Sequence, residues 1–224
     1  MMRVLVPELL DLLPADDPRA RRSRRDLARI NAMMMQHPIM AGALAGGPRP
    51  RLLADLGGGD GRFLLGVARR LKQWRGVRAM ILDRQAIVGC DTRDAFQALG
   101  WSCEVMQGDI FETLPRLSPD IVTANLFLHH LEDGELARLL ALVAARAGGF
   151  ATCEPRRSTF AVLGARLVFM LGANDVSRHD ALASVRAGFA GQELSSLWPK
   201  NFGWKIEELG VFPFTHRFVA RHAP

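Results

Sequence analysis

A glycine-rich loop offers the clearest chemistry in this sequence. It begins with Asp55, and glycine follows as Gly57, Gly58, Gly59 and Gly61. Glycine permits positive φ and lets the main chain approach a ligand closely. A helix that follows such a loop presents its amino-terminal N–H groups to the same space. The pattern therefore predicts a ligand-binding turn.

The residues around the loop narrow the kind of ligand. A dinucleotide fingerprint needs glycine at its sixth position, where this chain has Arg62, and a P-loop needs a Gly-Lys-Ser/Thr sequence that is absent. Asp55 would repel a pyrophosphate but would suit a cation such as the amino group of methionine. Asp83 ends the next apolar run, where a carboxylate can accept both hydroxyls of a ribose.

Short apolar runs and amphipathic helices alternate around these residues. We expect strands at 52–56, 78–82, 102–106, 121–124 and 150–153, with helices at 62–74, 92–99 and 134–147. This alternation predicts an α/β fold with a doubly wound, mostly parallel sheet. Two further strands, at 204–209 and 214–220, would complete seven strands with an antiparallel carboxyl-terminal edge.

Helical segments flank this core. Periodicity predicts helices at 6–13, 18–35, 158–173 and 180–190, and Gly46, Gly47, Pro48 and Pro50 mark a break before the first strand. We therefore divide the chain into a helical cap (1–50), an α/β core (51–155), a helical lid insertion (156–200) and the final strands (201–224).

Four separated blocks of the core resemble class I S-adenosylmethionine-dependent methyltransferases, and small-molecule O-methyltransferases in particular. The blocks are Ala54-Asp55-Leu56-Gly57-Gly58-Gly59-Asp60-Gly61, Leu82-Asp83-Arg84-Gln85-Ala86-Ile87-Val88, Gln107-Gly108-Asp109-Ile110-Phe111 and Leu128-His129-His130-Leu131-Glu132-Asp133. One glycine loop is weak evidence, but four blocks in order are specific. The resemblance implies a Rossmann-like methyltransferase fold with S-adenosyl-L-methionine as cofactor.

The resemblance also implies roles for individual residues. Gly57, Gly59 and Gly61 would lie against the cofactor, Asp55 would orient its methionine end, and Asp83 would hold the ribose. Asp109 would accept a hydrogen bond from the adenine amino group, and Ile110 would lie beside the adenine ring. Asn125 and Leu126 would lie near the methionine part of the cofactor. Gly58 and Arg84 complete the expected cofactor-binding set. Asp109 and Asp83 also fit a simpler interpretation as turn or cap residues.

A histidine follows the fourth strand in the O-methyltransferases, where it removes the proton of the substrate hydroxyl. His129 matches its place, and His130 stands beside it. Histidine titrates in the useful range for a general base. Three interpretations stay open: His129 is the base, His130 is the base, or the pair closes the strand and caps the next helix. No metal-ligand spacing occurs, so we predict no metal site.

The lid insertion would cover the acceptor. Its candidate lining residues are Phe160, Leu163, Leu167, Phe169, Met170 and Leu171, although we prefer to interpret most of them as ordinary helix core. Residues 177–180 read either as a polar loop entering the site or, preferably, as a helix start. Arg156 and Arg157 follow the fifth strand, where they would hold an acidic substrate or face solvent.

Bulk composition excludes some classes of protein. The net charge is +6. Six arginines lie between Arg19 and Arg29, and Asp26 is the one acidic residue among them. Such a stripe suits a phosphate backbone, an anionic membrane or, as we prefer, a solvated helix face. No apolar run reaches the roughly 20 residues of a membrane span, although peripheral membrane contact stays open. Three scattered cysteines imply no disulfide framework, which fits the cytoplasm.

Three functions follow from these observations. The first is methylation of oxygen or carbon on a small aromatic or phenolic metabolite by a monomer or homodimer. The second is RNA or other nucleic-acid methylation, which is disfavoured because residues 125–128 lack the Asn/Asp-Pro-Pro-aromatic motif and the chain has no tyrosine for base stacking. The third is a non-catalytic cofactor-binding protein. The sequence does not identify the acceptor.

Overall fold

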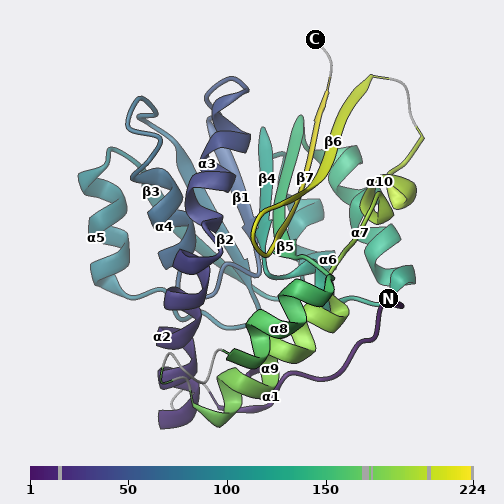
Figure 1. Cartoon of the computed structure of the whole chain (residues 1–224). Helices are drawn as coiled ribbons and strands as arrows, with labels where there is room; N and C mark the ends of the chain where they lie inside the picture. The colour runs from purple at the N-terminus through teal and green to yellow at the C-terminus, as the bar shows by residue number, and fades with distance from the viewer. Residues whose placement is uncertain (15–16, 168–171, 173, 201–202, 223–224) are drawn as a thin grey trace.

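A seven-stranded sheet forms the centre of the molecule (Figure 1). This computed structural model describes residues 1–14, 17–167, 172, 174–200 and 203–222. The strands are β1 (Leu52–Leu56), β2 (Arg78–Asp83), β3 (Ser102–Gln107), β4 (Ile121–Asn125), β5 (Gly149–Pro155), β6 (Trp204–Val211) and β7 (Thr215–His222). Their order is β3-β2-β1-β4-β5-β7-β6, with β1 to β5 parallel and β7 antiparallel to β5 and β6. The predicted mixed sheet is confirmed.

Helices cover both faces of this sheet. They are α1 (Leu9–Leu12), α2 (Pro18–Met33), α3 (Gln36–Ala45), α4 (Arg62–Ala68), α5 (Cys90–Ala98), α6 (Ile110–Thr113), α7 (Asp133–Arg146), α8 (Thr159–Leu167), α9 (Asp175–Ala187) and α10 (Glu193–Leu197), with short 3-10 turns η1 (Leu114–Arg116) and η2 (Leu128–His130). Successive residues of β1 point into two hydrophobic cores, one on each face of the sheet. Leu53 packs with the cluster of α3 and α4, whereas Ala54 packs with the cluster of α7.

Four of the helices gather beyond the carboxyl ends of the parallel strands. Helix α8 packs on α9, and α1 and α2 also pack on α9 (Figure 1). Helix α2 turns Ala20, Ser23 and Asp26 inward, whereas Arg21 and Arg25 are exposed. The arginine stripe therefore lies on an outward face, which agrees with each of the three interpretations of it.

The sequence misplaced several helices. Helix α3 was absent from the expectation because its residues are mostly small or apolar and carry no amphipathic period. Helix α4 ends at Ala68 rather than residue 74, although Leu71 and Trp74 beyond it are still buried. Helix α9 begins at Asp175 because the Asn174 side chain accepts from the Ser177 N–H at 2.8 Å.

No described helix is long and apolar enough to span a membrane. The division of the chain at residues 50, 155 and 200 stays a prediction.

Candidate functional site

Three carboxylates follow neighbouring strands at one edge of the sheet. Asp55 lies near the end of β1, Asp83 ends β2, and Asp109 lies two residues beyond β3. Since neighbouring strands are about 4.8 Å apart, the three residues form a row along this edge. The row ends where β1 meets β4, the point at which the strand order reverses and where ligands of open α/β sheets bind.

The glycine loop above this edge has the conformations that its sequence predicts. Gly57, Gly59 and Gly61 have φ values of 62°, 55° and 74°, which lie in the left-handed region. A Cβ at Gly57 would collide with the ring of Phe127, so that glycine is required by packing within the chain. A Cβ at Gly59 would meet nothing within 4 Å, which leaves open space beside the loop.

Asp55 lies beneath the loop and is 2% exposed. Its Oδ1 accepts from the Thr123 hydroxyl at 2.7 Å, and a Cβ at Gly58 would lie 2.7 Å from its Oδ2. Burial raises the pKa of Asp55 to about 7, because desolvation penalises the carboxylate. A cationic group beside Asp55 would offset that penalty.

Asp83 connects the loop to the second strand. Its Oδ2 accepts from the Gly59 N–H at 2.9 Å and its Oδ1 accepts from the Gln85 N–H at 2.8 Å. Each carboxylate oxygen can accept a second hydrogen bond, so both remain able to receive a hydroxyl. The structure thus shows the turn-capping interpretation of Asp83, and a part for Asp83 in ligand binding stays a prediction.

Asp109 caps helix α6. Its Oδ1 accepts from the Phe111 N–H at 2.8 Å, and Arg84 donates to its Oδ2 at 3.1 Å. The Phe111 N–H lowers the pKa of Asp109, with help from Arg84. Ile110 beside it is buried in the core cluster of α7. Arg84 and Asp109 therefore meet, although their part in ligand binding stays a prediction.

The last residue of β4, Asn125, and the residue after it, Leu126, have unusual local structure. The Oδ1 of Asn125 is buried and has no hydrogen-bond partner among the described residues. Leu126 has a φ of 50°, a conformation rarely adopted by a residue with a side chain, and its N–H donates to the Cys153 carbonyl at 3.0 Å. This turn directs Leu126 into an adjacent cavity.

His129 is 2% exposed and lies between two glutamates. Its Nδ1 is 2.8 Å from Glu154 Oε2, and its Nε2 is 3.3 Å from Glu8 Oε1. Desolvation lowers the pKa of His129, but hydrogen bonds and charge from both glutamates outweigh it and raise the pKa to about 9. In this conformation the imidazole is protonated at neutral pH and both ring nitrogens are engaged.

Glu154, which lies against His129, is itself held by several further hydrogen bonds. It is fully buried at the end of β5, where it accepts from the N–H groups of Phe127 and Leu128 and from the Thr152 hydroxyl. Burial opposes its ionised form, but the His129 hydrogen bond and charge keep the pKa of Glu154 below its usual range. Glu154 thus fixes both η2 and the His129 ring.

His129 and His130 form, together with Glu8, a grouping of side chains that are common metal ligands. The His130 ring is 4.2 Å from that of His129, and ligand atoms of Glu8, His129 and His130 all lie within 4.8 Å of one another. Histidine and carboxylate are zinc-ligand types. The two glutamates already account for the His129 nitrogens without an ion.

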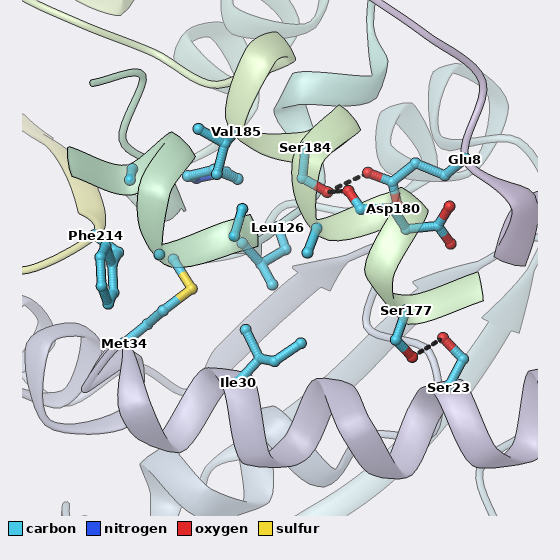
Figure 2. Close-up of a pocket in the computed structure, with 15 residues that line it drawn as sticks. Glu8, Ser23, Ile30, Met34, Leu126, Ser177, Asp180, Ser184, Val185 and Phe214 are labelled. Atoms are coloured by element: carbon cyan, nitrogen blue, oxygen red, sulfur yellow. Dashed lines mark hydrogen bonds between the residues drawn. The ribbon is translucent and has the colours of Figure 1, made fainter. Parts of the chain in front are cut away.

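A mostly apolar cavity of about 90 Å³ adjoins Glu8 of this grouping (Figure 2). Helices α2, α8 and α9 form most of its wall, and single residues from the amino-terminal segment, the end of α2, the ends of β4 and β5 and the β6–β7 turn complete it. The lining residues are Glu8, Ser23, Ile30, Met34, Leu126, Pro155, Ala161, Gly164, Ala165, Ser177, Asp180, Ala181, Ser184, Val185 and Phe214. Figure 2 shows Glu8 beside Ser184, which donates a hydrogen bond to it. Glu8 therefore lines the cavity and also contacts His129.

The lining of this cavity corrects part of the expectation for the lid. Helix α8 presents its small residues Ala161, Gly164 and Ala165 to the cavity, whereas Phe160 and Leu163 are 51% and 54% exposed. The Leu167 side chain and residues 169–171 lie outside the described residues. The sequence predicted Phe160 and Leu163 as helix core or, alternatively, as cavity lining, and both interpretations are wrong because α8 turns its small side inward.

The polar segment 177–180 is part of α9, as its preferred interpretation as a helix start expects. Ser177 and Asp180 nevertheless reach the cavity wall. Arg157 is buried and donates to Glu193 and to the carbonyls of Gly188 and Met1, so it faces neither solvent nor the cavity.

Glu8 was the main omission of the sequence analysis, which predicted its segment only as part of the helical cap. Arg3 donates to the Leu131 carbonyl at 2.7 Å and pairs with Asp133, and the Asp180 carboxylate accepts from the Leu9 and Leu10 N–H groups. These contacts hold Glu8 against His129. No local pattern near Glu8 could have indicated a partner that lies 121 residues further along the chain.

Known proteins share this architecture. No family model matches the chain. The mitomycin biosynthesis 6-O-methyltransferase of Streptomyces lavendulae is 30% identical over 92 residues, which cover 40% of this chain and 25% of that protein. An O-methyltransferase family protein from Burkholderia thailandensis has a TM-score of 0.62 at 20% identity, covering 93% of this chain and 61% of the other.

The plantazolicin methyltransferase BamL, in complex with a triazolic desmethylPZN analog and S-adenosylhomocysteine, gives a TM-score of 0.66 at 12% identity. That likeness covers 95% of this chain and 92% of BamL. The chain spans a quarter of the curated relative and about three fifths of the Burkholderia structure. At these identities the likeness shows the fold, so the expected Rossmann-like methyltransferase fold is confirmed.

Proposed function

We propose that this protein transfers the methyl group of S-adenosylmethionine to oxygen, or to carbon, of a small aromatic or phenolic metabolite. One observation carries the proposal: the row Asp109, Asp83 and Asp55 leads along the sheet edge to Asn125 and Leu126, beside an apolar cavity. The relatives named above are small-molecule methyltransferases, which supports the same chemistry here.

The residues of the row fit this cofactor. Asp109 would receive the adenine amino group, and the two oxygens of Asp83 keep acceptor capacity for the ribose hydroxyls. Asp55 and the unpaired Oδ1 of Asn125 offer acceptors for the methionine ammonium, and Gly59 leaves open space for the approach. When bound, the cofactor supplies a methyl group activated by the sulfonium.

The cavity would receive the acceptor. Its wall includes Leu126, so it adjoins the methionine end of the row. A volume of about 90 Å³ is smaller than the roughly 300 Å³ at the lower end of ordinary ligand sites. We therefore infer that α8, α9 or the amino-terminal segment moves outward to admit the acceptor, and that apolar contacts then orient it for transfer.

His129 would act as the general base. Glu154 holds Nδ1, which leaves Nε2 as the atom that takes the hydroxyl proton, and Glu8 occupies that side of the ring. An acceptor hydroxyl that displaced Glu8 would reach Nε2 and would remove one of the two carboxylates that raise the pKa of His129. Glu8 would thus give way to substrate, and Glu154 would position the base.

Calorimetry with S-adenosylhomocysteine tests the cofactor assignment. The wild-type chain should bind it, and Asp83→Ala should weaken binding by on the order of tenfold or more, as expected for lost hydrogen bonds to a charged group. Asp94→Ala removes an exposed carboxylate from α5 and serves as the control. Absence of wild-type binding would overturn the proposal.

Methyl transfer itself needs a separate measurement. Methyl-labelled S-adenosylmethionine incubated with a panel of phenols and hydroxyquinones should give labelled product in wild type and much less in His129→Ala. Binding of the cofactor without transfer to any small acceptor, together with transfer to RNA, would favour the nucleic-acid alternative.

A further inference from the structure

Gln36 is the first residue of α3, and its side chain is buried without hydrogen bonds. It is 0% exposed, and neither its Oε1 nor its Nε2 has a partner among the described residues. Buried amides are almost always paired, because leaving their donors and acceptors unsatisfied is costly. The unsatisfied Gln36 side chain therefore needs an explanation, and a ligand that forms hydrogen bonds with it would provide one.

The position of Gln36 places it beside the ligand edge. Met34, two residues earlier, lines the cavity together with Leu126. The Thr215 hydroxyl donates to the Met34 carbonyl at 3.0 Å, and Thr215 is paired with Pro155 at the carboxyl end of β5. Helix α3 then packs along β5 and α4. Gln36 therefore begins its helix at the edge where β4 and β5 end.

Asn125 provides a second unsatisfied buried atom at this edge. It directly precedes Leu126, and its Oδ1 has no hydrogen-bond partner in the part of the chain that the structure describes. Side chains alternate along a strand, so Asn125 shares a face with Thr123, which bonds Asp55. Leu53, two residues before Asp55, packs in the cluster that contains Met40 of α3. The face that carries Asp55 and Asn125 is therefore the face that α3 covers.

The ligand that would satisfy both amides has a donor group and an acceptor group. Asn125 Oδ1 and the Asp55 carboxylate are acceptors, which suit an ammonium. Gln36 Nε2 is a donor, which suits a carboxylate. The start of α3 adds to this preference, because Met35 at its cap has a φ of 54° and provides no side-chain cap for the first N–H groups.

We propose that Gln36, with the amino terminus of α3, binds the α-carboxylate of the methionyl end of the cofactor, opposite Asp55 and Asn125 at its ammonium. This assignment rests on the proposed function. It explains why an amide is kept in a buried position where none of the described residues bonds it. It also gives α3, which the sequence did not predict, a part in the site.

Two ligands separate this inference from the proposed function. S-adenosylhomocysteine has the amino-acid end, whereas 5′-methylthioadenosine has the same adenosyl part without it. We expect Gln36→Leu to weaken binding of S-adenosylhomocysteine by on the order of tenfold in calorimetry. Binding of 5′-methylthioadenosine should be unchanged. Met40→Leu, a buried apolar change in the same helix, should alter neither.

Thermal unfolding of the ligand-free chain provides a second readout. A leucine at position 36 removes an unsatisfied buried amide, so the variant should unfold at the same or a higher temperature than wild type. A merely structural amide would give the reverse, with a lower unfolding temperature.

Unchanged binding of S-adenosylhomocysteine by Gln36→Leu would overturn the inference and leave the proposed function in place. An equal loss for both ligands would also overturn it, because the effect would not depend on the amino-acid end. If wild type bound neither ligand, the proposed function and this inference would fail together.

Discussion

His129 Nδ1 lies 2.8 Å from Glu154 Oε2, and both side chains are buried at the point where β4 and β5 end. Backbone N–H groups of η2 bind the same carboxylate. Glu154 therefore sets the position of the loop and the orientation of the ring at once. This relationship leaves Nε2 as the side of the imidazole that faces Glu8, and Glu8 in turn lines the cavity.

Substitution of Glu154 should change the titration of His129. We expect Glu154→Gln to lower the pKa of His129 from about 9 toward its ordinary 6.5, because a neutral amide replaces the buried carboxylate. Methyl transfer should slow by on the order of 10²-fold, as for a misplaced general base. NMR titration of the ring and steady-state rates would measure both. Glu208→Gln changes another buried Glu–His pair, with His216, and should leave both unchanged.

Substitution of Glu8 should shift the pH dependence of the rate. Glu8→Gln removes a carboxylate that raises the pKa of His129, so more of the imidazole is neutral at pH 7. The acidic limb of the pH–rate profile should therefore move to lower pH by about one unit. Asp133→Asn breaks the pair with Arg3 in the same segment without touching His129. A limb that moved equally in both variants would assign the effect to the segment rather than to Glu8.

The core of the fold and the row of carboxylates could be predicted because their signals are local. The run from Leu52 to Leu56, the glycines after it and Asp83 at the next strand end each reveal their position within a few residues. Parallel topology then brings such strand ends to one edge. All five parallel strands were placed within two residues of their observed bounds.

The surroundings of His129 could not be predicted, because they depend on long-range contacts. Glu8 and Glu154 lie 121 and 25 residues from it in the chain, and only the folded amino-terminal segment brings Glu8 to the ring. The prediction for the residues of the lid insertion was wrong for another reason. Apolar size suggested Phe160 and Leu163 as cavity residues, whereas the packing of α8 on α9 exposes them.

The stability of the ligand-free chain should depend on the ionisation of Asp55. Its folded-state pKa of about 7 exceeds the ordinary 3.8, so the folded chain holds the proton more tightly than the unfolded chain. The free energy of unfolding should therefore be highest, for this group, below pH 4 and should fall as pH rises through 7. The decrease should be on the order of 4 kcal/mol.

Asp55→Asn should remove this decrease, since an amide can still accept from Thr123 but does not ionise. Urea denaturation at pH 5 and pH 8 would measure the part of the decrease that falls between these pH values, about 3 kcal/mol in the wild-type chain. Asp94→Asn, an exposed change, should keep the wild-type slope. An unchanged slope in Asp55→Asn would show that other groups cause the pH dependence.

Chelation should leave methyl transfer unchanged. The His129 nitrogens already face Glu154 and Glu8, so the grouping of Glu8, His129 and His130 needs no ion for its charge balance. Rates measured before and after treatment with EDTA, with metal analysis of the treated protein, would test this. A loss of activity that zinc restores would instead identify these three residues as metal ligands.

Filling the cavity should affect the acceptor but not the cofactor. Ala165 faces the cavity from α8, so Ala165→Leu should raise the KM for the acceptor by about tenfold, with an overpacking cost of about 1–3 kcal/mol in stability. Binding of S-adenosylhomocysteine should be unchanged, because the row from Asp109 to Asp55 lies along a different part of the edge. Leu163→Ala alters the exposed side of the same helix and should leave the KM as it is. The opposite pattern, with Leu163 sensitive and Ala165 not, would place the acceptor on the outer face of α8 and contradict the assignment of the cavity.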